Sequence, residues 1–197
     1  MKIGVIAYRG GNVRSIWSAL EELGVEVIYS DQPEVLRECG GLVFPGVGAA
    51  LPAVYDLQRR GLWEWIPQWE RPFLGICLGM QLLGQGSEEG PAPGLGIFPF
   101  QVQLFRGVVR LPHIGWNLVQ WSKEDPLQAG LPETFYAYFV HSYRAEVGDY
   151  TVGVSEYGET FSAVVRRGLF WGTQFHPEKS GAAGMQLLRN FLKVCKS

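Results

Sequence analysis

The stretch 71–83, which reads RPFLGICLGMQLL, constrains the fold of this chain most, because two patterns meet there at a cysteine. Its first half is a short apolar run typical of a buried parallel strand, and its second half repeats apolar side chains at helical spacing. Cys77 stands between them, flanked by Gly75 and Gly79, in the G-x-nucleophile-x-G pattern of a strand-to-helix elbow. The following helix favours a thiolate at its start. The stretch therefore predicts a nucleophile at Cys77, with a buried structural cysteine as the alternative.

The elements around this elbow predict an α/β fold in a single domain, residues 1–197. Strands and helices alternate with short links in the first half, whereas short strand-like runs in the second half indicate antiparallel pairing. We expect three layers, with a mostly parallel central sheet, flanking helices and antiparallel additions in the second half. Strands are expected at 2–7, 25–29, 42–44, 73–76, 97–105, 108–110, 117–121, 135–140, 150–154, 161–166 and 169–175, helices at 13–23, 33–38, from 49 to about 69 with breaks at 61 and 67, 78–83 and 182–194, and a surface loop at 84–96.

The composition argues against several classes of protein. A formal net charge of -2 gives no electrostatic basis for binding nucleic acid or an anionic membrane. No apolar run approaches the roughly 20 residues of a membrane span, and residues 1–7 resemble a signal peptide only superficially. The three cysteines, Cys39, Cys77 and Cys195, are too sparse for a disulfide framework. We therefore expect a cytoplasmic protein whose thiols stay reduced.

A candidate base follows the last expected strand, at His176-Pro-Glu178. A thiol nucleophile needs a base to take its proton and later return it to the leaving amine, and imidazole titrates near working pH. A carboxylate nearby can hold the ring in one tautomer and stabilise its charged form. Alone, the triplet also fits an ordinary strand-end histidine and a solvated glutamate. Together with the cysteine elbow, it predicts the catalytic set Cys77, His176 and Glu178.

An oxyanion site has two candidate sources. One is the backbone N–H of Leu78, the residue after the nucleophile. The other is Pro45-Gly-Val-Gly48, where glycine lets the backbone N–H of Val47 or Gly48 turn towards a reacting carbonyl. Without the elbow, this second stretch is equally well explained as a turn at a strand end. Gln81 lies one helical turn after the nucleophile and either contacts the same substrate or faces the core.

Five stretches together resemble a known family. Pro45-Gly-Val-Gly48, Gly75-Ile-Cys-Leu-Gly-Met-Gln81 and Gln174-Phe-His-Pro-Glu178 resemble the motifs of the class I, or triad, glutamine amidotransferases. Pro112-His-Ile-Gly-Trp-Asn117 and Tyr138-Phe-Val-His-Ser-Tyr143 are similar to stretches of one branch, the glutaminase subunits of imidazole glycerol phosphate synthase. The resemblance runs from residue 2 to the final helix.

The resemblance implies a chemical role for each member of the catalytic set. Cys77 attacks the side-chain amide of glutamine, His176 transfers the proton, Glu178 orients His176, and water then hydrolyses the glutamyl thioester. No cofactor and no metal ion is implied. The residues that match glutamine-contacting positions, several through backbone groups, are Gly46, Gly48, Leu78, Gln81, Ser142 and Tyr143.

The resemblance also implies a partner, a cyclase subunit with a (βα)8-barrel fold. In such a heterodimer, ammonia passes to the cyclase, which makes imidazole glycerol phosphate and an aminoimidazole carboxamide ribotide in histidine biosynthesis. The chain length points the same way, because a single sheet domain leaves no second domain for an ammonia acceptor. The loop 7–12 reads AYRGGN where family members often carry DYGxGN, and His141 is expected to be structural. The residues expected at the partner interface are Arg9, Asn12, His113, Trp116, Asn117, Tyr138 and Lys179.

Three alternatives remain at this stage. A glutaminase subunit for anthranilate or carbamoyl phosphate synthesis would keep the triad, but is not expected to carry the stretch HIGWN. A non-catalytic binding module would have no need to keep Cys77, His176 and Glu178 together. Nucleotide binding by residues 10–12 lacks the full G-x-G-x-x-G pattern.

Overall fold

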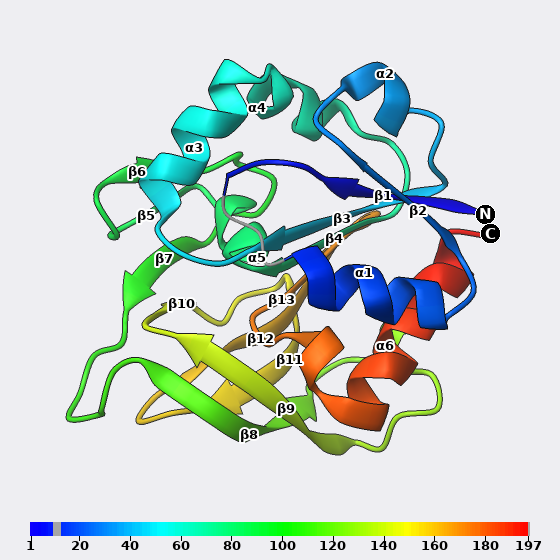
Figure 1. Ribbon diagram of the computed structural model, residues 1–197. Helices are drawn as coiled ribbons and strands as arrows, with labels where there is room; N and C mark the ends of the chain where they lie inside the picture. Colours follow the sequence, from blue (N-terminus) through cyan, green and yellow to red (C-terminus); the bar gives the residue numbers. More distant parts are fainter. Residues whose placement is uncertain (10–12, 197) are drawn as a thin grey trace.

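A nine-stranded sheet forms the middle of three layers in the computed structural model, which describes residues 1–9 and 13–196 (Figure 1). Its strand order is β2-β1-β3-β4-β13-β12-β11-β8-β9. The first five strands in this order pair in parallel, and the remaining strands add antiparallel pairs. The predicted α/β fold is confirmed. The strands are β1 (Lys2–Ile6), β2 (Glu26–Ser30), β3 (Gly41–Gly46), β4 (Phe73–Cys77), β8 (His113–Trp121), β9 (Thr134–His141), β11 (Thr151–Glu156), β12 (Thr160–Arg167) and β13 (Phe170–Thr173).

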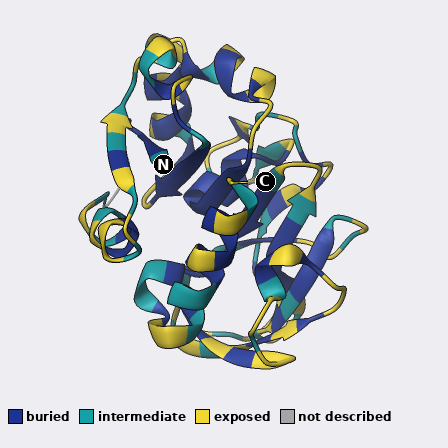
Figure 2. Ribbon diagram, turned by 90° about the vertical axis from the view of Figure 1, so that its right-hand side faces the viewer, coloured by how far each residue is buried: buried dark blue, intermediate teal, exposed yellow. Residues whose placement is uncertain are grey.

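Helices cover both faces of this sheet. On one face, α1 (Val13–Glu22) and α6 (Gly181–Val194) pack into one apolar cluster, and on the other α2 (Pro33–Leu36), α3 (Ala50–Arg59), α4 (Leu62–Trp65) and α5 (Leu78–Leu82) pack into a second. Figure 2 shows the buried residues concentrated in the sheet and on the inner faces of the helices. The described part of the chain also contains three 3-10 turns: η1 (Ile66–Gln68), η2 (Pro126–Gln128) and η3 (Pro177–Lys179). Among the described residues, no helix has the length and apolar character needed to cross a membrane.

A small second sheet, in the order β10-β7-β5-β6, occupies a region for which the sequence predicted a different arrangement. The expected surface loop 84–96 contains β5 (Gly86–Ser87) and β6 (Ala92–Pro93), and the expected strand 97–105 is reduced to β7 (Gln101–Leu104), which pairs with β10 (Tyr143–Ala145). Phe98 and Phe100 are buried and stacked on each other without strand pairing, so their apolar character reflects packing alone. The expected strand at 108–110 is wrong, because these residues form no strand.

Candidate active site

Cys77 lies on a tight turn between β4 and α5, as the sequence predicted. Its backbone φ is 53° and ψ is -108°, and it is the one non-glycine with positive φ among residues 1–9 and 13–196. A Cβ added at Gly79 would overlap the Phe44 carbonyl oxygen, and one added at Gly75 would lie 2.8 Å from the backbone nitrogen of Met80. Both flanking glycines are therefore required by close backbone approach, which holds the cysteine in its strained conformation.

Gly79→Ala is expected to lower the free energy of unfolding by about 3 kcal/mol, because the new methyl group forces α5 away from β3. Glutamine hydrolysis should fall as well, since the same movement displaces Cys77. Gly40→Ala is the matched control, because its Cβ would meet nothing nearer than 3.5 Å. Urea denaturation of both variants measures the difference. Equal stability of the two variants would contradict the steric role given to Gly79.

The candidate base, His176, lies directly before η3 with its carboxylate partner. Its Nδ1 is 2.9 Å from Glu178 Oε1, and both side chains are buried. This bond places the proton on Nδ1 in the neutral ring. Nε2 has no hydrogen-bond partner among the described residues, so it is the nitrogen that can take up a further proton. Burial is the largest influence on the ring and opposes its charging. The interactions with Cys77 and Glu178 together outweigh burial and raise the pKa of His176 to about 10. The site therefore favours the charged, imidazolium form of His176.

The loop that carries His176 is fastened to the edge strand β9. The His176 N–H donates to the Tyr138 carbonyl at 3.0 Å, and the Tyr138 N–H donates to Ser180 Oγ at 2.9 Å. The Ser180 hydroxyl in turn donates to the His176 carbonyl at 2.6 Å. These three bonds fix the base in place, and Ser180 is a supporting residue that no sequence motif had indicated.

The predicted oxyanion stretch is only partly a turn. Pro45 and Gly46 belong to β3, where Gly46 lies opposite Cys77 in the parallel register. A Cβ at Gly46 would overlap the Tyr8 hydroxyl and approach Leu78 Cβ to 2.8 Å, so this residue is tightly held. Gly48 has a φ of 94° and open space around it. Conformational freedom in the stretch is therefore confined to the peptides beyond Gly46.

A cavity of about 410 Å³ opens above the cysteine, and it gathers most of the predicted substrate-binding residues. Gly46 is buried and does not line the cavity. Gln81 reaches the cavity, but its amide nitrogen is already used by the Tyr143 carbonyl and the Gln174 side chain. The lining comprises Val47, Gly48, Ala49, Cys77, Leu78, Gln81, Glu89, Pro112, Val140, His141, Ser142 and Tyr143.

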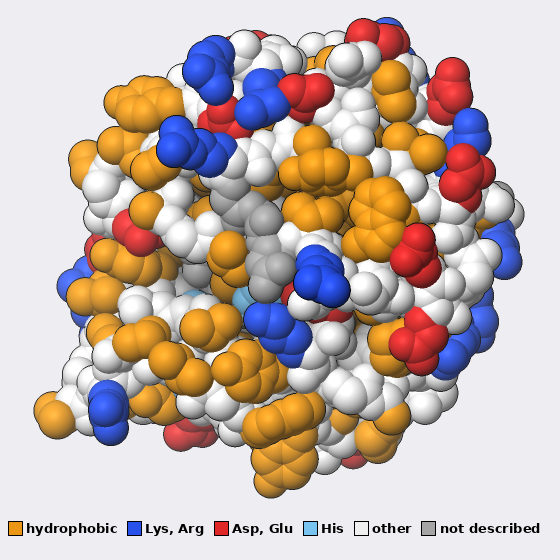
Figure 3. Space-filling view, in the orientation of Figure 1, with side chains coloured by type: hydrophobic (Ala, Val, Ile, Leu, Met, Phe, Trp, Pro, Cys, Tyr) orange, Lys and Arg blue, Asp and Glu red, His pale blue; other side chains and the backbone are white. Residues whose placement is uncertain are grey.

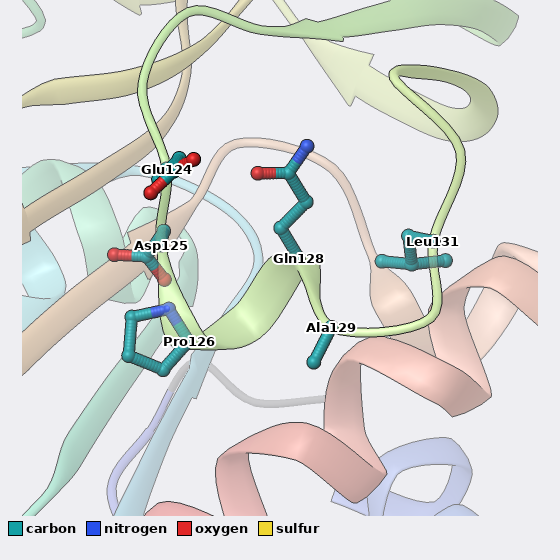
Figure 4. Close-up of a pocket in the computed structure, with 6 residues that line it drawn as sticks. All are labelled: Glu124, Asp125, Pro126, Gln128, Ala129 and Leu131. Carbon is teal, nitrogen blue, oxygen red and sulfur yellow. The ribbon is translucent and has the colours of Figure 1, made fainter.

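A larger hollow of about 610 Å³ lies around η2, far from the triad in the chain, and carries no comparable chemistry (Figure 4). Its one buried ionisable residue, Asp125, accepts hydrogen bonds from the Leu127 N–H at 2.8 Å and from Trp171 Nε1 at 3.1 Å. The Asp125 carboxylate thus starts η2 and anchors it to β13. We assign it a structural role.

The residues predicted to face a partner lie mainly on and beside β8 and β9. Trp116 is 57% exposed and meets the ring of Tyr138 edge to face. Gly181, two residues after Lys179, lies next to the Trp116 ring. Further exposed apolar side chains share the face with Trp116, and Figure 3 shows hydrophobic side chains gathered in the region where Figure 1 draws β8 and β9. They are Ile114, Leu118 and Tyr136.

The other predicted interface residues differ in their placement. Arg9 is exposed and its N–H donates to Asp56 Oδ2 at 2.6 Å, while Asn12 lies outside the described residues. Asn117 is half-buried, and its amide donates to the Glu156 carbonyl at 2.8 Å. The expectation that His113 faces a partner is corrected, because its side chain is only 4% exposed.

His113 instead belongs to a buried hydrogen-bonded row. Its Nε2 is 3.3 Å from Asn117 Nδ2, and its Nδ1 is 3.0 Å from His141 Nε2. His141 Nδ1 reaches the Tyr143 carbonyl at 2.7 Å. Burial lowers the pKa of His113 to about 4 and that of His141 to about 3, so both rings are neutral at pH 7. The structural role expected of His141 agrees with these contacts.

Comparison with known proteins gives a consistent result. The family model of class-I glutamine amidotransferases matches residues 5–195. The imidazole glycerol phosphate synthase subunit HisH of Bacteroides fragilis is 42% identical over 98% of this chain and 100% of its own length. The protein of the same name from Synechococcus sp. is 45% identical over 98% of this chain and 94% of its own length.

Solved structures add the fold. The crystal structure of one glutamine amidotransferase superposes with a TM-score of 0.76 at 22% identity, covering 99% of both chains. The crystal structure of another, from Thermotoga maritima, gives a TM-score of 0.71 at 20% identity, covering 100% of this chain and 99% of that one. At these identities, the likeness concerns the fold alone.

Proposed function

Since this chain belongs to the class-I glutamine amidotransferases, we propose that it is the glutaminase subunit of an imidazole glycerol phosphate synthase. It hydrolyses glutamine to glutamate and ammonia, and it delivers the ammonia to a cyclase subunit for the synthesis of imidazole glycerol phosphate. The single observation that carries the chemistry is the interaction of Cys77, on its strained elbow, with the ring of His176, whose Nδ1 is held by Glu178. The cytoplasm, where thiols stay reduced, is the compartment that suits this chemistry.

In the first half of the reaction, His176 Nε2 takes the proton of Cys77, and the sulfur attacks the amide carbon of glutamine. The developing imidazolium is stabilised by Glu178, which keeps the ring in place through its bond to Nδ1. His176 then gives the proton to the leaving nitrogen, and ammonia departs. In the second half, water attacks the thioester with His176 as base, and glutamate leaves.

The negative oxygen that forms during attack needs hydrogen-bond donors. We assign one donor to the N–H of Leu78, the first residue of α5, which lines the cavity beside Cys77. The second donor is an N–H of Val47 or Gly48, carried past Cys77 by the pairing of β3 with β4. One such donor contributes about 2.7–4 kcal/mol to the transition state. The orientation of the peptides at Val47 and Gly48 therefore controls the rate.

The partner docks on the outward face of β8 and β9 in this proposal. Alternate residues of these strands pair across the face as Ile114 with Val140, Trp116 with Tyr138 and Leu118 with Tyr136. An exposed aromatic and aliphatic surface of this kind is typical of a protein interface. It adjoins the loop of His176 through Tyr138, which places the docked cyclase, a (βα)8 barrel, close to the source of ammonia.

The isolated chain is expected to hydrolyse glutamine roughly 10²–10³-fold more slowly than the complex with the cyclase and its bound ligand, because one oxyanion donor is missing until the partner reorients the peptide. Gly48→Pro should remove most of this activation, since proline cannot adopt the φ of 94° and has no N–H. Glutaminase turnover of the free chain, the complex and the ligand-bound complex measures the effect.

A matched control is Gly168→Pro, which alters another glycine of positive φ on a distant turn. This variant should leave unchanged the ratio between the turnover of the ligand-bound complex and that of the free chain. If the free chain already turns over at the rate of the ligand-bound complex, the control of the rate through the Val47 and Gly48 peptides is wrong. If the chain does not bind the cyclase at all, the assignment to imidazole glycerol phosphate synthase is wrong.

A further inference from the structure

Gln174 is a buried polar residue that the reaction described above does not use. It follows β13, two residues before His176, and its side chain is fully buried. Its amide nitrogen lies 3.7 Å from the Cys77 sulfur, and its amide oxygen lies 3.0 Å from Gln81 Nε2. A buried amide in contact with the reacting sulfur calls for a chemical explanation beyond packing.

The direction of these hydrogen bonds follows from the Tyr143 carbonyl. A carbonyl only accepts, so the Gln81 atom that lies 3.0 Å from it is the amide NH2. That NH2 group has no acceptor, so the Gln174 atom facing it is the amide oxygen. The remaining atom of Gln174 is then its NH2, and this group faces Cys77. The network thus presents a donor to the sulfur.

The Tyr143 carbonyl is itself held in position from the other side. His141 Nδ1 donates to it at 2.7 Å, and His141 Nε2 accepts from His113 Nδ1 at 3.0 Å. Both rings are neutral, so each has one donor and one acceptor nitrogen. In each ring Nδ1 donates and Nε2 accepts, and no other assignment satisfies both hydrogen bonds. A row of buried bonds in which every orientation is determined resists reversal of the Gln174 amide.

We propose that Gln174 is a further catalytic residue that stabilises the Cys77 thiolate by donating a hydrogen bond to its sulfur. The proton of the thiol passes to His176 Nε2, and the negative sulfur accepts from Gln174 while it waits for substrate. Attack forms the carbon–sulfur bond and removes the charge. When water cleaves the thioester, the sulfur leaves as a thiolate and accepts from Gln174 again. The inference rests on the proposed role of Cys77 as nucleophile.

The test measures the alkylation rate of Cys77 by iodoacetamide as a function of pH in the full chain, quantified by mass spectrometry of the peptide that contains Cys77. Gln174→Met keeps the size of the side chain and removes the donor. The pH of half-maximal rate should rise by about one unit, the size expected for one hydrogen bond to a charged group. Gln174→Glu places a carboxylate against the sulfur and should raise the pH of half-maximal rate further, because the two negative charges repel each other.

The matched control is Thr173→Val, which removes a neighbouring buried hydrogen bond, from the Thr173 hydroxyl to the Phe175 carbonyl at 3.0 Å. It should lower the melting temperature without moving the alkylation profile. A wild-type profile in folded Gln174→Met and Gln174→Glu would overturn the proposal. The readout needs neither glutamine nor cyclase. The two ideas can therefore fail separately. If the proposed function is wrong, the chain will not turn over glutamine, although its alkylation can still depend on Gln174.

Discussion

Cys77→Ala is expected to lower glutamine-dependent synthesis by the complex by about 10⁴-fold or more, and to leave ammonia-dependent synthesis intact. The sulfur serves only to release ammonia, so free ammonia replaces its contribution. Alanine keeps the Cβ that the elbow already accommodates at a φ of 53°, and the fold should therefore tolerate the change. Product formation with glutamine and with an ammonium salt, at equal cyclase concentration, measures both activities.

The control for this experiment is assembly. Cys77→Ala and the wild-type chain should co-purify with the cyclase in the same ratio, since the proposed docking face on β8 and β9 does not include Cys77. Cys39→Ala serves as a matched variant, because Cys39 is also buried and free but lies away from the cavity. Loss of both activities in Cys77→Ala would indicate defective folding or assembly instead of a missing nucleophile.

His176→Ala should lower glutamine turnover by about 10⁴-fold or more, and Glu178→Gln by at least about tenfold less. The reason is that His176 itself transfers the proton, whereas the Glu178 carboxylate only orients the His176 ring and stabilises its charged form. In Glu178→Gln, the amide oxygen of the new side chain can still accept a hydrogen bond from His176 Nδ1, but it carries no charge. Steady-state glutaminase assays of the two variants in the complex provide the comparison.

Glu178→Gln also makes a pH prediction that a purely structural role does not. The carboxylate is one of the groups that raise the pKa of His176, so the neutral amide lowers it. The His176 ring then loses its extra proton at a lower pH. The alkaline inflection of the pH profile of Cys77 alkylation should therefore lie at a lower pH than in the wild type. Losses of equal size in the two variants, with no change in the pH profile, would remove Glu178 from its assigned role.

The parallel half of the fold followed from sequence because its patterns are local. The elbow at Cys77 and the strands around it are short apolar runs bounded by glycine and proline, and the structure confirms them within a few residues. The positions of Cys77 on its elbow and of His176 beside Glu178 were predictable for the same reason, since each motif is a continuous stretch. Their chemistry depends on residue types that few other arrangements explain.

The start of β8 was missed because its pattern is inverted. His113 points into the molecule, while Ile114, Trp116 and Leu118 point outwards, and Gly115 has a φ of 124°. A strand normally places its apolar side chains inside, so this stretch did not read as one. The inversion has a physical reason in the proposed docking of a partner on the outward face.

Contacts between distant parts of the chain could not be predicted from the sequence either. Gln174 meets Gln81 across 93 positions of sequence, and Ser180 meets Tyr138 across 42. Neither pair leaves a periodic signal, because each bond depends on the packing of β13 and η3 against their neighbours. The stretch that begins at Gln174 was used for His176 and Glu178, and only the folded chain places the Gln174 amide beside Cys77.

The outward face of β8 and β9 has a consequence for the cell that makes this protein. β9 is the edge strand of the large sheet, and large apolar side chains stand on it and beside it in contact with water. Copies synthesised in excess of the cyclase would keep that apolar face in contact with water, which favours self-association over solubility. A shortage of cyclase is therefore expected to appear first as aggregated copies of this chain.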